Sequence, residues 1–335
     1  MGVKLPDHEW ASIMAEYRFD QFWQAAAGKK VEAPFPYQLR LATKPWPDLL
    51  KVPTGLGKTA SVVLAWIHKR LQDDPETPRR LVYCLPMRTL VEQTAANTRT
   101  WLQNIRAAGL DTNGQLPLGP HVLMGGETDD DWIRSPEKPA ILIGVQDILL
   151  SRALMRGYGV GRGRWPVDFA LLHNDAMWVF DEVQLMAAGA PTSAQLEALR
   201  RKIGTMVGCR SLWMSATLER DWLNTADLDA SQLTSQGLEA EDRVHTIVRI
   251  RLGAPKTLDK AEVAVTSITR TDKGVNQYAE ANCGETPPRQ DDAGYCQPRE
   301  PSTGPLRRTQ EERGKERCST VARSQPLPPD RAPEA

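Results

Sequence analysis

The stretch "KVPTGLGKTASVV", residues 51–63, decides the fold. It continues the short apolar run "LLKV" (49–52) and leads into a segment whose apolar residues have helical spacing. A glycine-rich turn between a strand and a helix predicts a phosphate-binding loop, because its N–H groups point at phosphate oxygens and the helix dipole adds positive charge. Val52 stands where the usual pattern has its first glycine, but the glycines nearest the phosphates are present.

The polar residues of this loop have distinct expected roles. Gly55 and Gly57 let the backbone curl, and Lys58 supplies a positive charge for the β- and γ-phosphates. The Thr59 hydroxyl is expected to serve as a ligand for Mg²⁺. We therefore expect ATP and Mg²⁺ as cofactors, with the nucleotide held by Thr54, Gly55, Gly57, Lys58 and Thr59. A plain glycine turn before a helix is the alternative.

Short apolar runs alternate with amphipathic stretches over the first 230 residues. One helical pattern has Val63, Trp66, Ile67 and Leu71 on a single face, and a longer pattern runs from about residue 88 to 105. Strands that alternate with helices predict an α/β fold with a doubly wound, mostly parallel sheet and sites at the carboxyl ends of the strands. The expected strands are 49–52, 80–86, 121–124, 140–145, 177–182 and 210–217.

A pair of carboxylates follows one of these strands in "MWVFDEVQ" (177–184). Packing alone does not explain adjacent charges at the end of a buried strand. Asp181 is expected to hold the magnesium ion, and Glu182 to orient and deprotonate the attacking water. A solvated acidic turn is the alternative.

The phosphate loop, Asp-Glu-Val-Gln and then "WMSATL" (213–218) occur in the order seen in the first RecA-like domain of superfamily 2 helicases, which residues 30–225 resemble. This resemblance implies a P-loop NTPase domain in which Lys58, Asp181, Glu182 and Gln184 are catalytic. It also implies that Ser215 and Thr217 couple ATP to nucleic acid, and that Thr59 and Asp181 are the metal ligands.

The same resemblance extends to binding residues. "PFPYQLRLA" (34–42) is similar to the motif that reads adenine, so Gln38 is expected to contact the base edge while Phe35 or Tyr37 stacks on it. "LPMRTLVEQT" (85–94) and the glycine pair after Met124 resemble motifs that contact a single strand. The nucleic-acid residues implied are Arg88, Gln93, Gly125, Gly126 and Gln146.

Within this superfamily, "ILIGVQDILLSRAL" (141–154) followed by Asp-Glu-Val-Gln resembles the effector helicase of type I CRISPR systems. Gln146, Asp147, Ser151 and Arg152 match that family, whereas Val145 replaces its common threonine. The implied partners are single-stranded DNA, or RNA in the alternative of another superfamily 2 helicase, and a CRISPR surveillance complex. The family's His-Asp nuclease is not expected here, because the chain has no His-Asp dipeptide.

Composition separates the chain into parts. Its 335 residues carry 42 Lys+Arg and 42 Asp+Glu, so any nucleic-acid surface is a local patch. All ten tryptophans lie at or before Trp222, whereas residues 271–335 hold nine of the 25 prolines. We expect a helical extension (1–33), the RecA-like domain (34–230), the remnant of an interdomain connection (231–270) and a disordered tail (271–335). Neither a signal sequence nor a membrane span is expected, which favours the cytoplasm.

A second RecA-like domain is the largest expected absence. Superfamily 2 enzymes take an arginine finger from a Gln-x-x-Gly-Arg-x-x-Arg motif, and residues 231–335 contain no such pattern. We therefore expect an ATP-dependent translocase or helicase present as its N-terminal half and weakly active alone. A frameshift, a truncated reading frame or a divergent tail would each give this pattern. The alternative from another class is a non-catalytic nucleotide-binding or interaction module.

Overall fold

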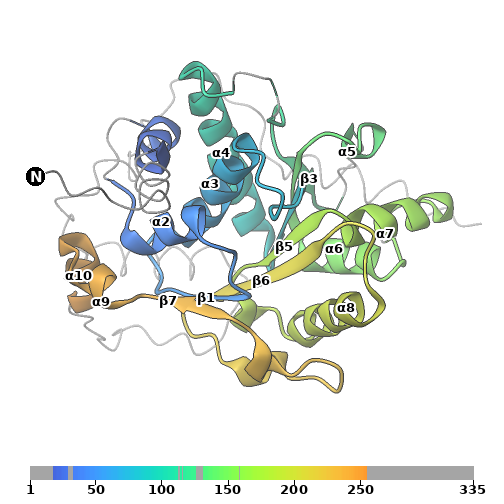
Figure 1. Ribbon diagram of the computed structural model, residues 1–335. Helices are drawn as coiled ribbons and strands as arrows, with labels where there is room; N and C mark the ends of the chain where they lie inside the picture. The colour runs from blue at the N-terminus through green and yellow to red at the C-terminus, as the bar shows by residue number, and fades with distance from the viewer. Residues whose placement is uncertain are drawn as a thin grey trace, which may run out of the picture. The chain divides into compact units, whose positions relative to one another are not determined.

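The computed structural model describes residues 18–28, 33–111, 114, 116–125, 131–157 and 159–254 (Figure 1). Residues 18–27 form a helix, as expected. The expected disordered tail and the 255–270 part of the expected connection lie outside the described residues. Among the described helices, none is long and apolar enough to cross a bilayer.

A seven-stranded sheet organises the domain, and all of its paired strands are parallel, where a mostly parallel sheet was expected. Its order is β3-β4-β2-β5-β6-β1-β7. The strands are β1 (Leu49–Lys51), β2 (Arg80–Leu85), β3 (His121–Leu123), β4 (Ala140–Val145), β5 (Ala176–Phe180), β6 (Cys209–Ser215) and β7 (Ser235–Gly237). Six of them lie within one or two residues of the predicted ranges.

Helices connect these strands, and most of the long ones follow a strand directly. They are α2 (Pro36–Thr43), α3 (Lys58–Leu71), α4 (Arg88–Ala107), α5 (Asp131–Arg134), α6 (Gln146–Ala153), α7 (Trp165–His173), α8 (Gly189–Ile203), α9 (Ala240–Val244) and α10 (Thr246–Gly253). Short 3₁₀ segments lie at Arg162–Arg164, Val183–Leu185, Arg220–Leu223 and Ala230–Gln232.

The sheet separates two hydrophobic clusters because its side chains alternate between the two faces. In the fully buried β2, Leu81 and Tyr83 belong to the cluster beneath α3 and α4, whereas Val82 and Cys84 belong to the cluster beneath α6 and α8. Figure 1 shows α3 and α4 on one side of the sheet and α6, α7 and α8 on the other. This covering of both faces explains why the strands read as continuous apolar runs.

The helix of residues 18–27 packs on the first of these clusters. Phe19, Phe22 and Trp23 are all buried, which places them on one face as predicted. Phe19 and Phe22 lie 5.0 and 5.2 Å from the imidazole of His68, measured between ring centroids. The N-terminal helix is therefore fixed to α3, the helix that follows the phosphate loop.

The sheet continues past residue 230, where the sequence suggested that the domain ends. β7 pairs with β1 in parallel, with Leu49 opposite Ser235. Before the two strands, the Asp48 carboxylate accepts hydrogen bonds of 2.8 Å from both the N–H and the hydroxyl of Thr234. Residues 231–254 thus add a strand and two helices to the same compact unit.

Candidate active site

The phosphate loop lies between β1 and α3, as predicted. Gly55 and Gly57 have φ angles of 81° and 78°, a backbone conformation that residues with a Cβ rarely adopt. Gly57 is also the N-cap of α3, so the free N–H groups of the first helical turn begin at Lys58. The loop therefore has the positive helix end that phosphate binding requires.

Val52, which stands in the place of the usual first glycine, is fully buried and contacts Lys58 through its backbone carbonyl. The Lys58 ammonium donates to the Val52 oxygen at 3.1 Å and lies 3.8 Å from a Glu182 carboxylate oxygen. The Lys58 residue is 7% exposed. Its charge is thus held at the cavity wall between two protein oxygens.

Asp181 and Glu182 follow β5 and face this loop. The Thr59 hydroxyl lies 3.4 Å from Asp181 Oδ2, and the Glu182 N–H donates to Asp181 Oδ1 at 2.9 Å. Glu182 adopts a left-handed backbone with φ of 52° and ψ of 49°. A non-glycine residue in this region is strained, and such strain gathers at functional sites.

Asp181 is buried, and its environment sets its acidity. Burial raises the pKa of Asp181 to about 6, while the hydrogen bond from Tyr83 and the nearby Lys58 charge act in the opposite direction. The Tyr83 hydroxyl donates to Asp181 Oδ2 at 2.8 Å. Burial raises the pKa of Tyr83 well above its ordinary value, so it remains a phenol and a donor. Tyr83 was missed in the sequence because it reads as an ordinary strand residue.

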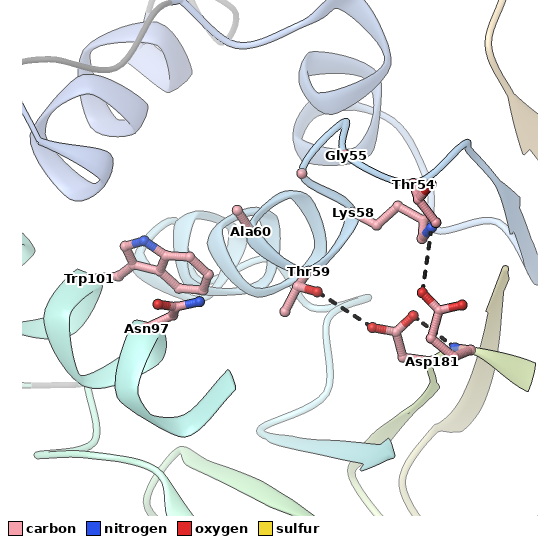
Figure 2. A pocket seen from close by; sticks show the side chains of 10 residues that line it. Thr54, Gly55, Lys58, Thr59, Ala60, Asn97, Trp101 and Asp181 are labelled. Atoms are coloured by element: carbon pink, nitrogen blue, oxygen red, sulfur yellow. Dashed lines mark hydrogen bonds and ion pairs between the residues drawn. The ribbon is translucent and has the colours of Figure 1, made fainter. Parts of the chain in front are cut away.

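A cavity of about 300 Å³ joins these groups (Figure 2). Figure 2 shows Lys58 and Thr59 pointing from the start of α3 toward Asp181, with Asn97 and Trp101 on the neighbouring helix α4. Its lining residues are Thr54, Gly55, Gly57, Lys58, Thr59, Ala60, Asn97, Trp101, Asp181 and Glu182. Asn97 and Trp101 were not predicted, since nothing in their local pattern distinguishes them from other residues of a long helix.

A chain of polar contacts leads from the cavity to the end of β6. The Gln184 amide donates to Glu182 at 2.5 Å, and the Ser215 hydroxyl donates to the Gln184 carbonyl oxygen at 2.6 Å. Ser215 then accepts from the Thr217 N–H at 3.0 Å. The expected catalytic and coupling residues are thus brought together through Gln184.

Gln38 lies beside the phosphate loop, but its side-chain amide is hydrogen-bonded to other protein groups and is not exposed to a nucleotide base. It is 2% exposed, donates to the Leu56 carbonyl and to Ser61, and accepts from the Phe35 N–H at 2.8 Å. Tyr37 is fully buried and donates to the Leu56 carbonyl at 2.6 Å. Neither side chain is open to a base here, so Phe35 is the remaining stacking candidate.

The predicted nucleic-acid residues share the carboxyl edge of the sheet. Arg88, which begins α4, is exposed next to Gly125, where a built Cβ would lie 2.6 Å from the Arg88 guanidinium. Gln93 is exposed on the first turns of α4, and Gln146 begins α6 at the end of β4. Gly126 lies outside the described residues.

Comparison with known proteins assigns the family. A family model described as DEAD/DEAH box helicase matches residues 43–225, more than half of the chain. The chain belongs to the DEAD/DEAH box helicase family. The matched region contains the phosphate loop and Asp181-Glu182, which line the cavity, and Ser215, which is connected to Glu182 through Gln184. Among curated proteins, none matches the chain.

Solved helicase structures resemble the chain over part of their length. The DUF1998 helicase MrfA bound to DNA is 16% identical with a TM-score of 0.47, covering 67% of this chain and 30% of MrfA. Mycobacterium smegmatis Lhr bound to ssDNA and AMP-PNP is 20% identical with a TM-score of 0.44, covering 66% of this chain and 28% of Lhr. Mss116p bound to ssRNA and AMP-PNP is 18% identical with a TM-score of 0.43, covering 62% of this chain and 41% of Mss116p. The chain thus spans less than half of the length of these helicases.

Proposed function

We propose that this chain binds ATP with Mg²⁺ as the first RecA-like domain of a superfamily 2 helicase and uses it to move along single-stranded nucleic acid. One observation carries the proposal: Lys58 and Thr59 face Asp181 and Glu182 across a single cavity. This arrangement suits a polyphosphate with a divalent cation. The Lys58 ammonium would meet the phosphates, and the Thr59 hydroxyl and the two carboxylates would face the cation and the attacking water.

The donor set fits magnesium. Mg²⁺ prefers carboxylate, hydroxyl, phosphate and water oxygens, and Asp181 and Thr59 supply the first two of these within 3.4 Å of one another. When bound, Mg²⁺ would neutralise negative charge on the phosphate oxygens. The Tyr83 hydroxyl donates to Asp181 Oδ2 and would hold this carboxylate in place for the ion.

The protein groups act on the phosphates and the attacking water. Lys58 exchanges its contacts with Val52 and Glu182 for phosphate oxygens. Glu182, once released from the ammonium, accepts the proton of a water molecule in line with the terminal phosphate. Gln184 holds Glu182 and passes a change in its position to Ser215.

We expect turnover by this chain alone to be slow. In superfamily 2 a second domain supplies an arginine, and residues 231–335 contain no matching motif. An arginine finger contributes on the order of 10³- to 10⁵-fold to the rate of NTP hydrolysis. A phosphate-release assay that gave fast, DNA-stimulated turnover would contradict this expectation.

Lys58→Ala tests the nucleotide site. Removing the ammonium should weaken ATP–Mg²⁺ binding by at least about 100-fold, since it is the charge that meets the phosphates. Isothermal titration calorimetry on the full chain measures this loss. Lys51→Ala, which removes an exposed lysine just before the loop, is the matched control and should bind as the wild type does. Equal affinities for the two variants would exclude the proposed site.

For the nucleic acid we propose single-stranded DNA, contacted along Arg88, Gln93, Gly125 and Gly126. The support is the exposed Arg88 beside Gly125 at the edge of the sheet where the ATP cavity lies. Backbone-directed contacts imply weak, sequence-tolerant and salt-sensitive binding. Anisotropy titrations with DNA and RNA strands measure this, and tight, salt-independent binding would contradict it.

The finer assignment to the CRISPR-associated type, with a surveillance complex as partner, rests on the resemblance of residues 141–154 to that family. The Gln146–Ala153 segment is helix α6, which begins at the same carboxyl edge as the ATP cavity. Pull-down with a type I surveillance complex tests this assignment, and retention no greater than for an unrelated helicase would reject it.

A further inference from the structure

The base side of the proposed nucleotide site is covered by the chain itself. The 300 Å³ cavity reaches the phosphate loop but is not lined by Gln38 or Phe35, the residues expected to meet the base. Phe35 is 9% exposed, and its ring lies 5.0 Å from that of His245 in an edge-on arrangement. His245 joins α9 to α10, and Figure 1 shows these two helices beside α2.

Asp242 anchors α9 firmly. Its carboxylate is fully buried and accepts from the Tyr37 N–H at 2.6 Å and from the Arg40 guanidinium at 2.5 Å. A third bond comes from the Glu239 N–H at 2.8 Å. A buried carboxylate with three donors is costly to displace, so α9 is the fixed end of the segment.

α10 is attached more lightly. Its one buried side chain is Val248, Ile247 is partly buried against the same core, and the Arg251 guanidinium donates to the Gly55 carbonyl of the phosphate loop. His245 ends α9 and begins α10 with φ of −57° and ψ of 127°, a non-helical conformation between two helices. Rotation at this residue moves α10 and the imidazole without disturbing Asp242.

We propose that His245 and α10 compete with the nucleotide base for Phe35, so that ATP binds fully only when α10 swings away. This inference rests on the proposed ATP site and adds its regulation. Among the described residues, two aromatic rings lie near Phe35: the buried Tyr37 at 6.3 Å and His245 at 5.0 Å. Because Tyr37 is held in the core, His245 is the neighbour that a purine stacking on Phe35 would replace.

Competition of this kind lowers the apparent affinity in proportion to the fraction of open molecules. It acts on ligands that carry a base and spares those that consist of phosphate alone. Arg251 strengthens the closed form, since its contact with Gly55 is broken when α10 moves.

The test compares Mg²⁺–ATP with Mg²⁺–tripolyphosphate, a ligand without a base, by calorimetry on the full 335-residue chain. His245→Ala should raise the affinity for ATP by roughly three- to tenfold, as expected when the closed form holds most of the population. Its affinity for tripolyphosphate should stay within about twofold of wild type, because a ligand without a base does not depend on the fraction of open molecules. Arg251→Ala removes an exposed side chain and is the second variant, expected to change ATP binding in the same direction. Arg249→Ala removes an exposed arginine from the same helix and should change neither ligand.

Three results would overturn the inference. ATP affinity that is unchanged or weaker in both His245→Ala and Arg251→Ala excludes competition. Equal gains for ATP and tripolyphosphate indicate a loosened phosphate loop instead. If Lys58→Ala leaves ATP binding intact, the proposed nucleotide site fails and the inference fails with it, whereas a normal loss in Lys58→Ala confines the failure to His245.

Discussion

Asp181 shows how a single residue of this domain is prepared for a cation. It is 4% exposed, and burial raises its pKa to about 6, whereas the hydrogen bond from Tyr83 and the charge of Lys58 act to lower the pKa. Tyr83 supplies that donor from the adjacent strand β2. A divalent ion beside the carboxylate would further favour its ionised form.

His68 contributes a pH dependence of stability. It lies in α3 against Phe19 and Phe22, and burial lowers its pKa from 6.5 to about 4, with Lys69 acting in the same direction. Below pH 6.5 the unfolded chain takes up a proton that the native chain accepts only near pH 4. The free energy of unfolding therefore falls as pH decreases over this window, by roughly 3 kcal/mol in total.

The His68→Gln variant tests this dependence. It should show a shallower decline in the free energy of unfolding between pH 7 and 4.5 than wild type, because the variant cannot take up that proton in the unfolded state. Urea denaturation at several pH values measures both slopes. His121→Gln, at the half-buried start of β3, is the control. Parallel slopes for wild type and His68→Gln would show that His68 does not carry the effect.

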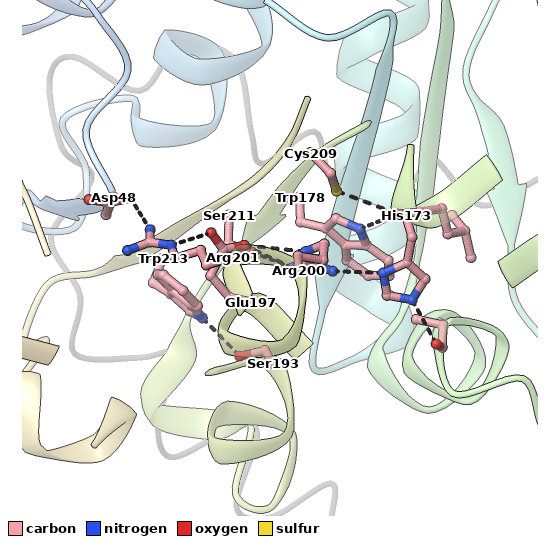
Figure 3. Close-up of polar contacts among 12 residues, drawn as sticks. Asp48, His173, Trp178, Ser193, Glu197, Arg200, Arg201, Cys209, Ser211 and Trp213 are labelled. Atoms are coloured by element: carbon pink, nitrogen blue, oxygen red, sulfur yellow. Dashed lines mark hydrogen bonds and ion pairs between the residues drawn. The ribbon is translucent and has the colours of Figure 1, made fainter. Parts of the chain in front are cut away.

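Between elements, a buried polar network links helices α7 and α8 to the sheet (Figure 3). The Arg200 guanidinium donates to Glu197 at 3.0 Å and to Ser211 at 2.8 Å, and it lies 3.3 Å from His173 Nδ1. His173 is then held against the Ala153 carbonyl at the end of α6. Burial lowers the pKa of His173, which favours the neutral ring that such a position beside Arg200 requires.

The same network reaches the edge of the sheet through the neighbouring arginine. Arg201 pairs with Glu197 and with Asp48, both at 2.8 Å, and Asp48 in turn holds Thr234 before β7. Arg201 is itself exposed, so these ion pairs add little net stability, but they fix where α8 meets the segment before β1. The order of β6, β1 and β7 is thus specified by side chains as well as by backbone pairing.

How far the sequence predicted the structure depended on the element. β4 was predicted at its observed bounds, since "AILIGV" is a buried apolar run, and α3 followed from the spacing of Val63, Trp66 and Ile67. β7 was not predicted, because its three residues "SQG" carry no apolar signal and pair only with β1. Local patterns report burial within an element but not an edge strand held by distant partners.

The candidate site divides in the same way. Lys58, Thr59, Asp181 and Glu182 were predicted and lie together, since each follows a strand of one parallel sheet and so shares its carboxyl edge. The contacts of Trp101 and of Arg251 depend on how α4 and α10 pack, over separations that no local pattern reports. The burial of Gln38 was likewise not predicted, because its amide is held by Leu56 and Ser61, contacts that form only when α2 packs beside the phosphate loop and α3.

At the scale of the whole molecule, the placement of residues 231–254 decides where the domain ends. Removing them would expose the edge of β1 and take away Asp242, leaving the buried Arg40 guanidinium and the Tyr37 N–H without that partner. An uncompensated buried charge costs about 3–5 kcal/mol. The lost burial of Val248 adds to this cost.

Two truncations measure this placement. The chain 1–256 should unfold within about 2 °C of the full protein, the shift expected for under 1 kcal/mol, because it keeps the whole compact unit that ends at Lys256. The chain 1–230 should be insoluble or melt lower by about 10 °C or more, as a loss of 3–5 kcal/mol implies for a domain of this size.

Asp242→Asn in the full chain is the point control: it keeps β7 and α10 but weakens the bond to Arg40, so its melting temperature should fall between those of the two truncations. Differential scanning fluorimetry, with circular dichroism to confirm the fold, gives all four values. If 1–230 melts together with 1–256, then β7 and α9 contribute nothing to the stability of the domain, and the anchor assigned to Asp242 is wrong.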